Sequence, residues 1–272
     1  MTVIKVGQSA VQLPVDFEAA THGGGFAFGL NKAGSTMLND ALRRMTANTS
    51  TGYFDFVGVF SRARIALKRQ EFSEETIQAI ESYLARPGVV WGGWRKYPFN
   101  YRLPLGPATR TYLLVRDPRD VVTSKYFSVK YSHSTAGPVD GILKTREMLG
   151  NQDIDTFALD RAHQTAGWFR DYDILCSSHF LLRRYEDIIF DKGKFVAELC
   201  SHFEIDIPKQ RLESVAKAID IRPEAEDVMA HVRRVTPGDH REKLKEETVE
   251  QLNDIFKDIL AKYDYKADVR SN

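Results

Sequence analysis

The sequence predicts an α/β fold, with a mainly parallel central sheet flanked by helices in three layers. Two observations predict it. Short apolar runs typical of buried strands alternate along the chain with longer segments of helical periodicity. Turns that carry glycine, lysine or arginine follow several of these runs, as expected where parallel strands end at one edge of a sheet. The 272 residues fit one large domain or two small ones, and we expect a single domain over residues 1–272.

The composition bounds the function. Hydrophobic residues make up 43% of the chain, which is ample for a buried core, and 38 Lys and Arg nearly balance 37 Asp and Glu. This balance gives no argument for nucleic acid as a partner, so any anion site must be local. Two cysteines, Cys176 and Cys200, exclude a disulfide framework and fit a reducing compartment. Because we find neither a signal peptide nor an apolar run of about 20 residues, we expect a cytoplasmic protein without a transmembrane segment.

The first half of the chain is read from its apolar periodicity and its glycine and proline breaks. Ser73 is a plausible N-cap for one helix. The expected elements, in order, are an irregular N-terminal arm over 1–24, a strand over 26–30, a helix over about 35–45, a strand or loop over 53–57, a basic segment over 62–69 with some helical character, a helix over about 73–85 and a strand over 89–91.

The second half continues the alternation. Asp117 can cap a helix that has Pro118 at its first position. The expected elements are a strand over 111–115, helices over about 118–129, 139–149 and 154–171, a strand over 180–182, helices over 195–203 and from 208, a polar loop over about 221–243 and a C-terminal amphipathic helix over 246–262. An aromatic loop over 92–107 is long for a connector, and we expect its rings, with those of the preceding strand, to line a binding pocket: Trp91, Trp94, Tyr97, Phe99 and Tyr101.

The segment 26–38 predicts an anion site. It combines a buried strand, a glycine-bearing turn with Lys32, and a helix start, so backbone N–H groups and the helix N-terminus converge on one point. Gly29 and Gly34 have the spacing of the nucleoside-triphosphatase pattern, but Ser35 stands where that pattern has its lysine. An ordinary strand–turn–helix with a solvated lysine is the simpler alternative.

A second motif lies at the end of the strand 111–115. Arg116 offers a bidentate fork, and Ser124 offers a hydroxyl roughly 9 Å further along the helix axis. Together they would suit a second phosphate, apart from the first. The alternative is that Arg116 pairs only with Asp120 and that Ser124 is a surface residue of the helix.

Four blocks, taken together, resemble the sulfotransferases that use 3′-phosphoadenosine 5′-phosphosulfate (PAPS). The blocks are Lys32–Thr36, Arg116–Ser124, Tyr185–Asp187 and Arg233–Asp239, and they occur in the family's order. The resemblance implies the P-loop-like α/β fold of the cytosolic sulfotransferases. It also implies transfer of a sulfuryl group to an acceptor hydroxyl or amine of a carbohydrate, lipid or small molecule.

The resemblance assigns a role to each matching residue. Lys32 would act on the bridging oxygen as the sulfuryl group departs, and Tyr185 would lie against the adenine. The segment from Ala33 to Thr36 would cradle the 5′-phosphate. The implied cofactor-binding residues are Lys32, Ala33, Gly34, Ser35, Thr36, Arg116, Ser124, Tyr185, Arg233 and Arg234, of which Arg116, Ser124, Arg233 and Arg234 would hold the 3′-phosphate. No metal is expected, because positioning and electrostatics supply most of the catalysis in such transfers.

Three departures from the family pattern stand out. Met37 replaces a tryptophan that often stacks on the adenine. Val235 replaces a glycine of the C-terminal basic loop formed by Arg233–Asp239, called the late loop below. The histidine that many members carry after the strand equivalent to 89–91 is missing, so the acceptor's base must come from elsewhere. We predict His133 in this role, ahead of His22, and leave aspartate and glutamate alternatives unranked. The remaining histidines are expected to be surface or structural residues: His163, His179, His202, His231 and His240.

Two other functions stay open at this point. A P-loop-type nucleotide kinase or a non-catalytic nucleotide-binding module would use the same loop, although Ser35 in the lysine position counts against ATP chemistry. A family member that has lost catalysis would bind a partner instead, but the joint presence of Lys32, Arg116 and Ser124 argues against it. The acceptor class and the oligomeric state are not indicated by these patterns.

Overall fold

The central sheet of the computed structural model has five parallel strands in the order β4-β5-β3-β6-β7. These strands are β3 (Gly25–Gly29), β4 (Gly52–Asp55), β5 (Val89–Trp94), β6 (Thr111–Val115) and β7 (Phe180–Arg184). The structure describes residues 23–63, 72–132, 150, 152–175, 179–230 and 233–267, and the backbone of 2–6 and 9–13. The order places β3, with its anion loop, in the middle of the sheet.

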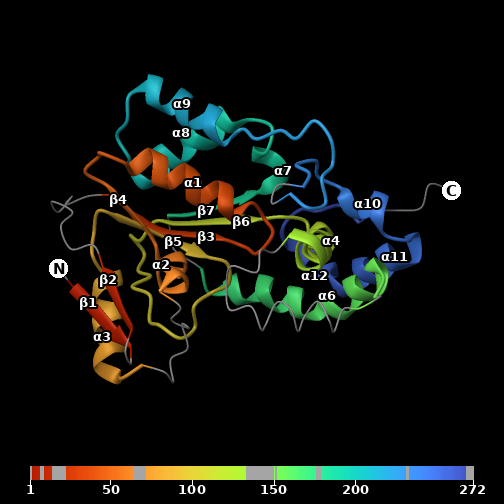
Figure 1. The fold of residues 1–272 in the computed structure, drawn as a ribbon, viewed down its shortest axis with the longest axis horizontal. Coiled ribbons are helices and arrows are strands. Elements are labelled where there is room, and N and C mark those ends of the chain that lie inside the picture. The colour runs from red at the N-terminus through yellow and green to blue at the C-terminus, as the bar shows by residue number, and fades with distance from the viewer. Residues whose placement is uncertain are drawn as a thin grey trace.

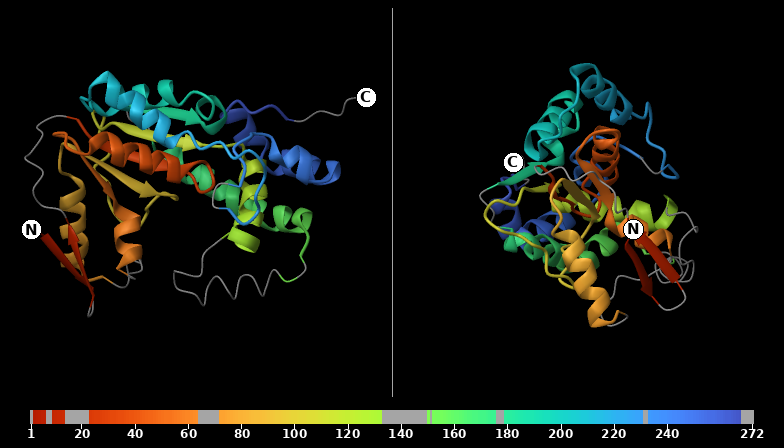
Figure 2. Two further views of the ribbon diagram at one scale, coloured as in Figure 1. Left: turned by 45° about the horizontal axis from the view of Figure 1, so that its top comes forward. Right: turned by 90° about the vertical axis from the view of Figure 1, so that its left-hand side faces the viewer.

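Helices cover both faces of the sheet, as Figures 1 and 2 show. Successive residues of β3 point to opposite sides, so Ala27 packs with one apolar cluster while Phe26 and Phe28 pack with the other. The first cluster includes α1 (Ser35–Thr46), α8 (Lys192–Phe203) and α9 (Lys209–Ile219). The second includes α2 (Phe56–Arg62), α3 (Glu74–Leu84), α4 (Pro118–Phe127), α6 (Ile154–Arg170), α11 (Glu246–Ile255) and α12 (Lys257–Lys262). The predicted three-layer α/β fold is confirmed.

The N-terminal arm differs from the prediction of an irregular segment. Residues Thr2–Val6 form β1 and Ser9–Leu13 form β2, and the two strands pair antiparallel beside α3, apart from the central sheet (Figure 1). Both pieces are short runs rich in residues that favour strands, and they pair with Thr2 opposite Leu13 and Val6 opposite Ser9. Each strand has only five residues, too few for a clear alternating pattern, so the sequence did not predict this pairing. A single domain over 1–272 stays a prediction.

Several boundaries also differ. Residues 53–57 contain both a strand and a helix start, because the Asp55 side chain caps α2 by accepting a hydrogen bond from Gly58 N. The predicted helix 246–262 is interrupted at Phe256, which separates α11 from α12, and the polar loop 221–243 contains the short helix α10 (Asp239–Lys243). The remaining elements are η2 (Ser128–Ser132), η3 (Asp171–Ile174) and α7 (Tyr185–Ile188). The predicted helix 139–149 lies outside the described residues, as does most of 62–69.

Among the helices that the structure describes, none has the length and apolar character needed to cross a membrane.

Candidate nucleotide-binding and catalytic site

The anion loop follows β3 and ends in α1. Lys32 has a φ of 68° and Gly34 a φ of 87°, so two left-handed residues turn the chain sharply from the strand into the helix. A Cβ atom at Gly34 would lie 3.0 Å from Cδ2 of Tyr185, so this glycine also lets the turn pack against that ring. The N-terminal N–H groups of α1 are thereby left facing the same space as Lys32, which is the geometry of an anion site.

A cavity of about 320 Å³ lies beside this loop. Separate segments of the chain line it, and four of them carry nine of the predicted site residues: Lys32, Gly34, Ser35, Thr36, Arg116, Ser124, Tyr185, Arg233 and Arg234. Ala33 is fully buried beneath the loop, and Met37 lines the cavity where relatives often have tryptophan. His133 lies outside the described residues. The structure therefore brings together all the expected cofactor-binding residues except the buried Ala33, whose backbone belongs to the same loop.

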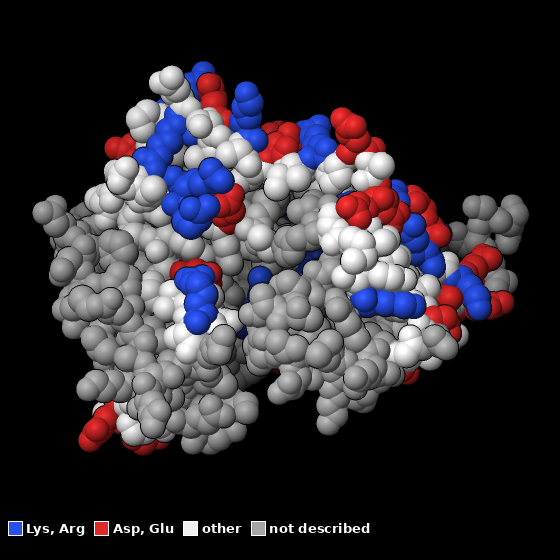
Figure 3. Space-filling model, in the orientation of Figure 1, with Lys and Arg blue, Asp and Glu red and all other residues white. Residues whose placement is uncertain are grey.

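Cations converge at the cavity. Burial, assisted by the charges of Arg95, Arg116 and Arg233, lowers the pKa of Lys32 to about 8. Arg95 directly follows β5, lines the cavity and was not singled out from the sequence. Its position at a strand end is the signal that would have identified it. Such a concentration of positive charge favours a strongly anionic ligand. Over the described part of one face, by contrast, acidic and basic side chains are interspersed (Figure 3).

Arg116 is the most constrained of these cations. Its side chain is buried, its guanidinium lies 4.7 Å from the centre of the Tyr185 ring, and its Nη2 donates to Asp120 Oδ2 at 3.1 Å. Its Nε has no hydrogen-bond partner among the residues that the structure describes, although it is buried at the cavity wall. The pairing with Asp120 that was weighed as an alternative is thus present, and it coexists with a donor left available for an anion.

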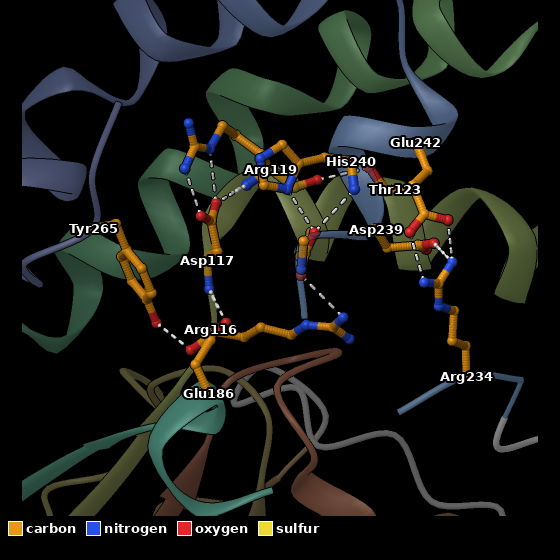
Figure 4. Close-up of polar contacts among 12 residues, drawn as sticks. Arg116, Asp117, Arg119, Thr123, Glu186, Arg234, Asp239, His240, Glu242 and Tyr265 are labelled. Atoms are coloured by element: carbon orange, nitrogen blue, oxygen red, sulfur yellow. Dashed lines mark hydrogen bonds and ion pairs between the residues drawn. The ribbon is translucent and has the colours of Figure 1, made fainter. Parts of the chain in front are cut away.

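Asp120 joins the end of β6 to the late loop. It is fully buried and accepts hydrogen bonds from Gly238 N at 2.8 Å, His240 N at 3.0 Å and His240 Nδ1 at 2.6 Å (Figure 4). Although burial opposes ionisation, Arg116 and the His240 donors hold the pKa of the Asp120 carboxyl well below its usual range. His240 is therefore a structural histidine, as expected, and Asp120 positions both Arg116 and the segment that follows Arg233 and Arg234.

The late loop closes over Tyr185. Burial raises the pKa of Tyr185 to about 12, so its hydroxyl stays protonated and donates to Val235 O at 3.1 Å. The contact of Val235 with this hydroxyl is made by its backbone carbonyl. Arg233 lies 4.1 Å from the centre of the Phe127 ring.

Carboxylates hold the two arginines of the late loop in place. Arg233 pairs with Glu226 and Asp239. Arg234 Nη2 donates to Glu242 Oε1 at 2.7 Å (Figure 4). Both guanidinium groups still line the cavity. Their orientation is therefore fixed before any anion enters.

A second buried network supports the same strand ends. Arg119 is fully buried and donates from Nη2 to Asp117 Oδ2 at 2.6 Å and from Nη1 to Asn253 Oδ1 at 2.7 Å. Glu186 accepts from Asp117 N at 3.1 Å and from Tyr265 Oη at 3.0 Å, and burial raises its pKa (Figure 4). The residues between Arg116 and Ser124, and those after Tyr185, thus fix the ends of β6 and β7 relative to each other.

The prediction that the aromatic rings line an acceptor pocket is wrong for most of them. Trp91, Trp94, Tyr97 and Tyr101 are all buried in the core cluster beneath the sheet, and only Phe99 is exposed. For Trp94 the reason is that β5 runs on to this residue, so it is a strand residue and not a loop residue. Trp91, a strand residue as predicted, lies in the same core cluster.

Comparison with known proteins agrees with the fold. The family model of the sulfotransferase domain matches residues 105–264, and the chain belongs to this family. The mouse sulfotransferase SULT7A1, complexed with PAP, has a similar structure, with a TM-score of 0.56 and 11% sequence identity over 90% of this chain and 86% of that chain. No curated protein matches by sequence.

Two further structures align over most of the chain with lower scores. A retinol dehydratase in complex with retinol and PAP has a TM-score of 0.48 and 14% identity, covering 91% of this chain and 82% of that chain. A sulfotransferase domain from the curacin biosynthetic pathway has a TM-score of 0.42 and 12% identity, covering 90% and 99%. Among the described residues, no group of three or more His, Cys, Asp or Glu could hold a metal ion.

Proposed function

We propose that this protein transfers a sulfuryl group from PAPS to an acceptor hydroxyl or amine. The observation that carries the proposal is the convergence of Lys32, Arg116, Ser124 and Arg233 on one cavity, from segments far apart in the sequence. A nucleotide with a 5′-phosphosulfate and a separate 3′-phosphate needs two such cationic sites. The PAP bound to the mouse sulfotransferase supports the same ligand here.

Each end of the nucleotide has matching groups. The 5′-phosphate fits the N-terminus of α1 and the backbone from Ala33 to Thr36. The 3′-phosphate fits the unpartnered Arg116 Nε and the Ser124 hydroxyl, with Arg233 and Arg234 opposite. Tyr185 is packed between Gly34 and the Arg116 guanidinium, so only an edge of its ring would meet the adenine.

Lys32 carries the chemical step in this proposal. As the acceptor oxygen bonds to sulfur, the bond between sulfur and the bridging oxygen breaks and charge develops on the departing 5′-phosphate. The Lys32 ammonium stabilises that charge and can give the bridging oxygen a proton, since its pKa of about 8 lies near neutrality. For the group that takes the acceptor's proton, His133 stays the sequence-based prediction.

The test of the proposal is the Lys32→Ala variant. Transfer of labelled sulfate from PAPS should fall by about 100-fold or more, because a charge aimed at the leaving oxygen is lost. The matched control is Lys209→Ala, since that side chain is 90% exposed and lies on α9, away from the cavity. Activity of Lys32→Ala comparable to the control would refute the mechanism.

Thermal shift separates PAPS chemistry from ATP chemistry. Adenosine 3′,5′-bisphosphate should raise Tm, because it binds only the folded chain. ATP with Mg²⁺ should raise it less, since Ser35 replaces the triphosphatase lysine. Stabilisation by the triphosphate alone would instead support a P-loop-type kinase or nucleotide-binding module.

A further inference from the structure

A second cavity, of about 440 Å³, adjoins the nucleotide cavity. The two share Thr36, Asp40 and Arg95 in their walls. The second cavity is otherwise bounded by the carboxyl end of β4 and by residues of α1 and α2, among them Tyr53, Asp55 and Arg62. Nothing in the proposed nucleotide site uses these last three residues.

The sheet order separates two approaches to Lys32. Since β3 is central, the loop that carries Lys32 has β6 and β7 on one side and β5 and β4 on the other. The proposed nucleotide residues Arg116 and Tyr185 come from the β6–β7 side. In an in-line transfer the acceptor enters opposite the leaving phosphate. The space on the β4–β5 side, where the second cavity opens, is therefore the acceptor's route.

Near its carboxyl end β5 has two residues without side chains, Gly92 and Gly93. Side chains of the neighbouring strand β4 occupy the space beside them. Asp55 is opposite Gly92 in the parallel register. A Cβ atom at Gly93 would lie 2.1 Å from Asp55 Oδ1, and one at Gly92 would lie 2.6 Å from Cε2 of Tyr53. The two glycines, which stand close to where relatives carry their histidine, thus make room for Asp55 and Tyr53.

Both side chains have hydrogen-bonding capacity left. Asp55 Oδ1 accepts from Gly58 N at 2.8 Å, while Oδ2 lies 3.8 Å from Arg62 Nη1, beyond hydrogen-bond length, and the side chain is 30% exposed. Within the described part of the chain the buried Tyr53 hydroxyl has no hydrogen-bond partner, and burial raises its pKa above the usual range. An oriented carboxylate and an unsatisfied hydroxyl therefore line one cavity, which is what a hydroxyl-bearing ligand requires.

We propose that the second cavity is the acceptor subsite and that Asp55, rather than His133, takes the proton of the acceptor hydroxyl. The inference rests on the proposed sulfuryl transfer. The acceptor class it favours is a polyhydroxylated, glycoside-like molecule, because most residues of the walls carry a carboxylate, guanidinium, amide or hydroxyl group, while Phe54 and Val59 add apolar surface for a sugar ring. The aromatic rings that would have suited a lipid or a phenol are instead in the core.

The step balances as follows. The acceptor's O–H proton passes to an Asp55 carboxylate oxygen while the acceptor oxygen forms its bond to sulfur. The bond from sulfur to the bridging oxygen breaks, and adenosine 3′,5′-bisphosphate leaves with the bonding electron pair. Asp55 then loses its proton to water, and the products are the sulfated acceptor, the bisphosphate and one proton.

The experiment compares Asp55→Asn with His133→Gln and with the matched control Asp258→Asn. Asparagine keeps the oxygen that caps α2 but removes the base. Asp258 is exposed on α12, where it pairs with Arg170. Methyl β-D-glucopyranoside, methyl β-D-galactopyranoside and 2-naphthol serve as acceptor probes for labelled sulfate, and calorimetry gives the Kd of adenosine 3′,5′-bisphosphate.

We expect a glycoside to be sulfated in preference to 2-naphthol. For Asp55→Asn we expect kcat to fall by about 100-fold or more, with the bisphosphate Kd within about twofold of the control. Sulfation of 2-naphthol alone, or of no probe, would overturn the acceptor class. An unchanged kcat in Asp55→Asn, or a loss of kcat confined to His133→Gln, would overturn the assignment of Asp55 as the base. A wild type that does not bind the bisphosphate would refute the proposed function instead.

Discussion

Replacing Asp120 by alanine should damage both the fold and the nucleotide site. The carboxylate is completely buried and receives hydrogen bonds from Arg116, Gly238 and His240. Without it, the buried Arg116 guanidinium loses its counter-charge, and the donors of the 238–240 turn lose their acceptor. Removing one partner of a buried ion pair costs about 3–5 kcal/mol, because the other charge stays buried and uncompensated.

The destabilisation expected for Asp120→Ala can be compared with that for an exposed ion pair, Asp258 with Arg170. Asp258 bonds Arg170 at 3.0 Å, with side chains 58% and 52% exposed, so Asp258→Ala should cost about 0–1 kcal/mol. Urea denaturation gives the two free energies of unfolding. At roughly 2–4 °C per kcal/mol, Asp120→Ala should lower Tm by at least about 6 °C. Adenosine 3′,5′-bisphosphate should also bind more weakly, since the turn beyond Arg234 is no longer anchored.

The pH dependence of the free energy of unfolding tests whether the ionised Asp120 carboxylate is the source of the lost stability. Since the pKa of the Asp120 carboxyl is lower in the folded than in the unfolded chain, the carboxylate contributes stability above its unfolded pKa. This contribution is lost as pH falls toward the folded pKa. The difference in free energy of unfolding between the wild type and Asp120→Ala should therefore become smaller at acidic pH. A destabilisation by Asp120→Ala of less than about 1 kcal/mol at neutral pH would refute the reasoning, as would a destabilisation equal to that caused by Asp258→Ala.

Three further predictions concern the ligand. Because Lys32 loses its proton above its pKa of about 8, the affinity for adenosine 3′,5′-bisphosphate should decline as pH rises from 7 to 9, and in Lys32→Arg, which stays charged, calorimetry should show no decline. Arg116→Lys should weaken the bisphosphate by about 10-fold or more but leave adenosine 5′-phosphate nearly unchanged, because only the 3′-phosphate meets the lost fork; equal losses for both nucleotides would contradict this. Incubation with EDTA should leave sulfate transfer unchanged, and a loss restored by Mg²⁺ would contradict the expected metal-free mechanism.

Local patterns predicted most of the scaffold. The apolar run 111–115 became β6 with the same bounds, and the caps at Ser73 and Asp117 accept the expected backbone hydrogen bonds. These signals lie within a few residues of each other, so a single sequence contains them. The loop around Lys32 and the Arg116–Ser124 motif are of the same local kind, and the structure places both at one cavity.

What the sequence could not reveal depends on distant partners. Asp120 and His240 are 120 positions apart, and nothing near either residue indicates the other. Asp55 was assigned only to a strand or loop, because its relation to Gly92 and Gly93 depends on which strands are neighbours and in which register. The ring of Trp94 was misjudged for a similar reason. Two glycines suggested a loop, whereas a neighbouring strand on each side keeps the segment in the sheet.

The contact between Gly34 and Tyr185 restricts how this protein can change. The ring occupies the space where any side chain at position 34 would begin, and the backbone there has a φ of 87°, which favours glycine in its own right. A smaller residue at position 185 would relieve the first constraint but not the second, and it would remove the surface on which Arg116 rests. An engineer who wishes to alter the nucleotide preference therefore has more freedom at Met37, which lines the same cavity from α1, than at either of these two positions.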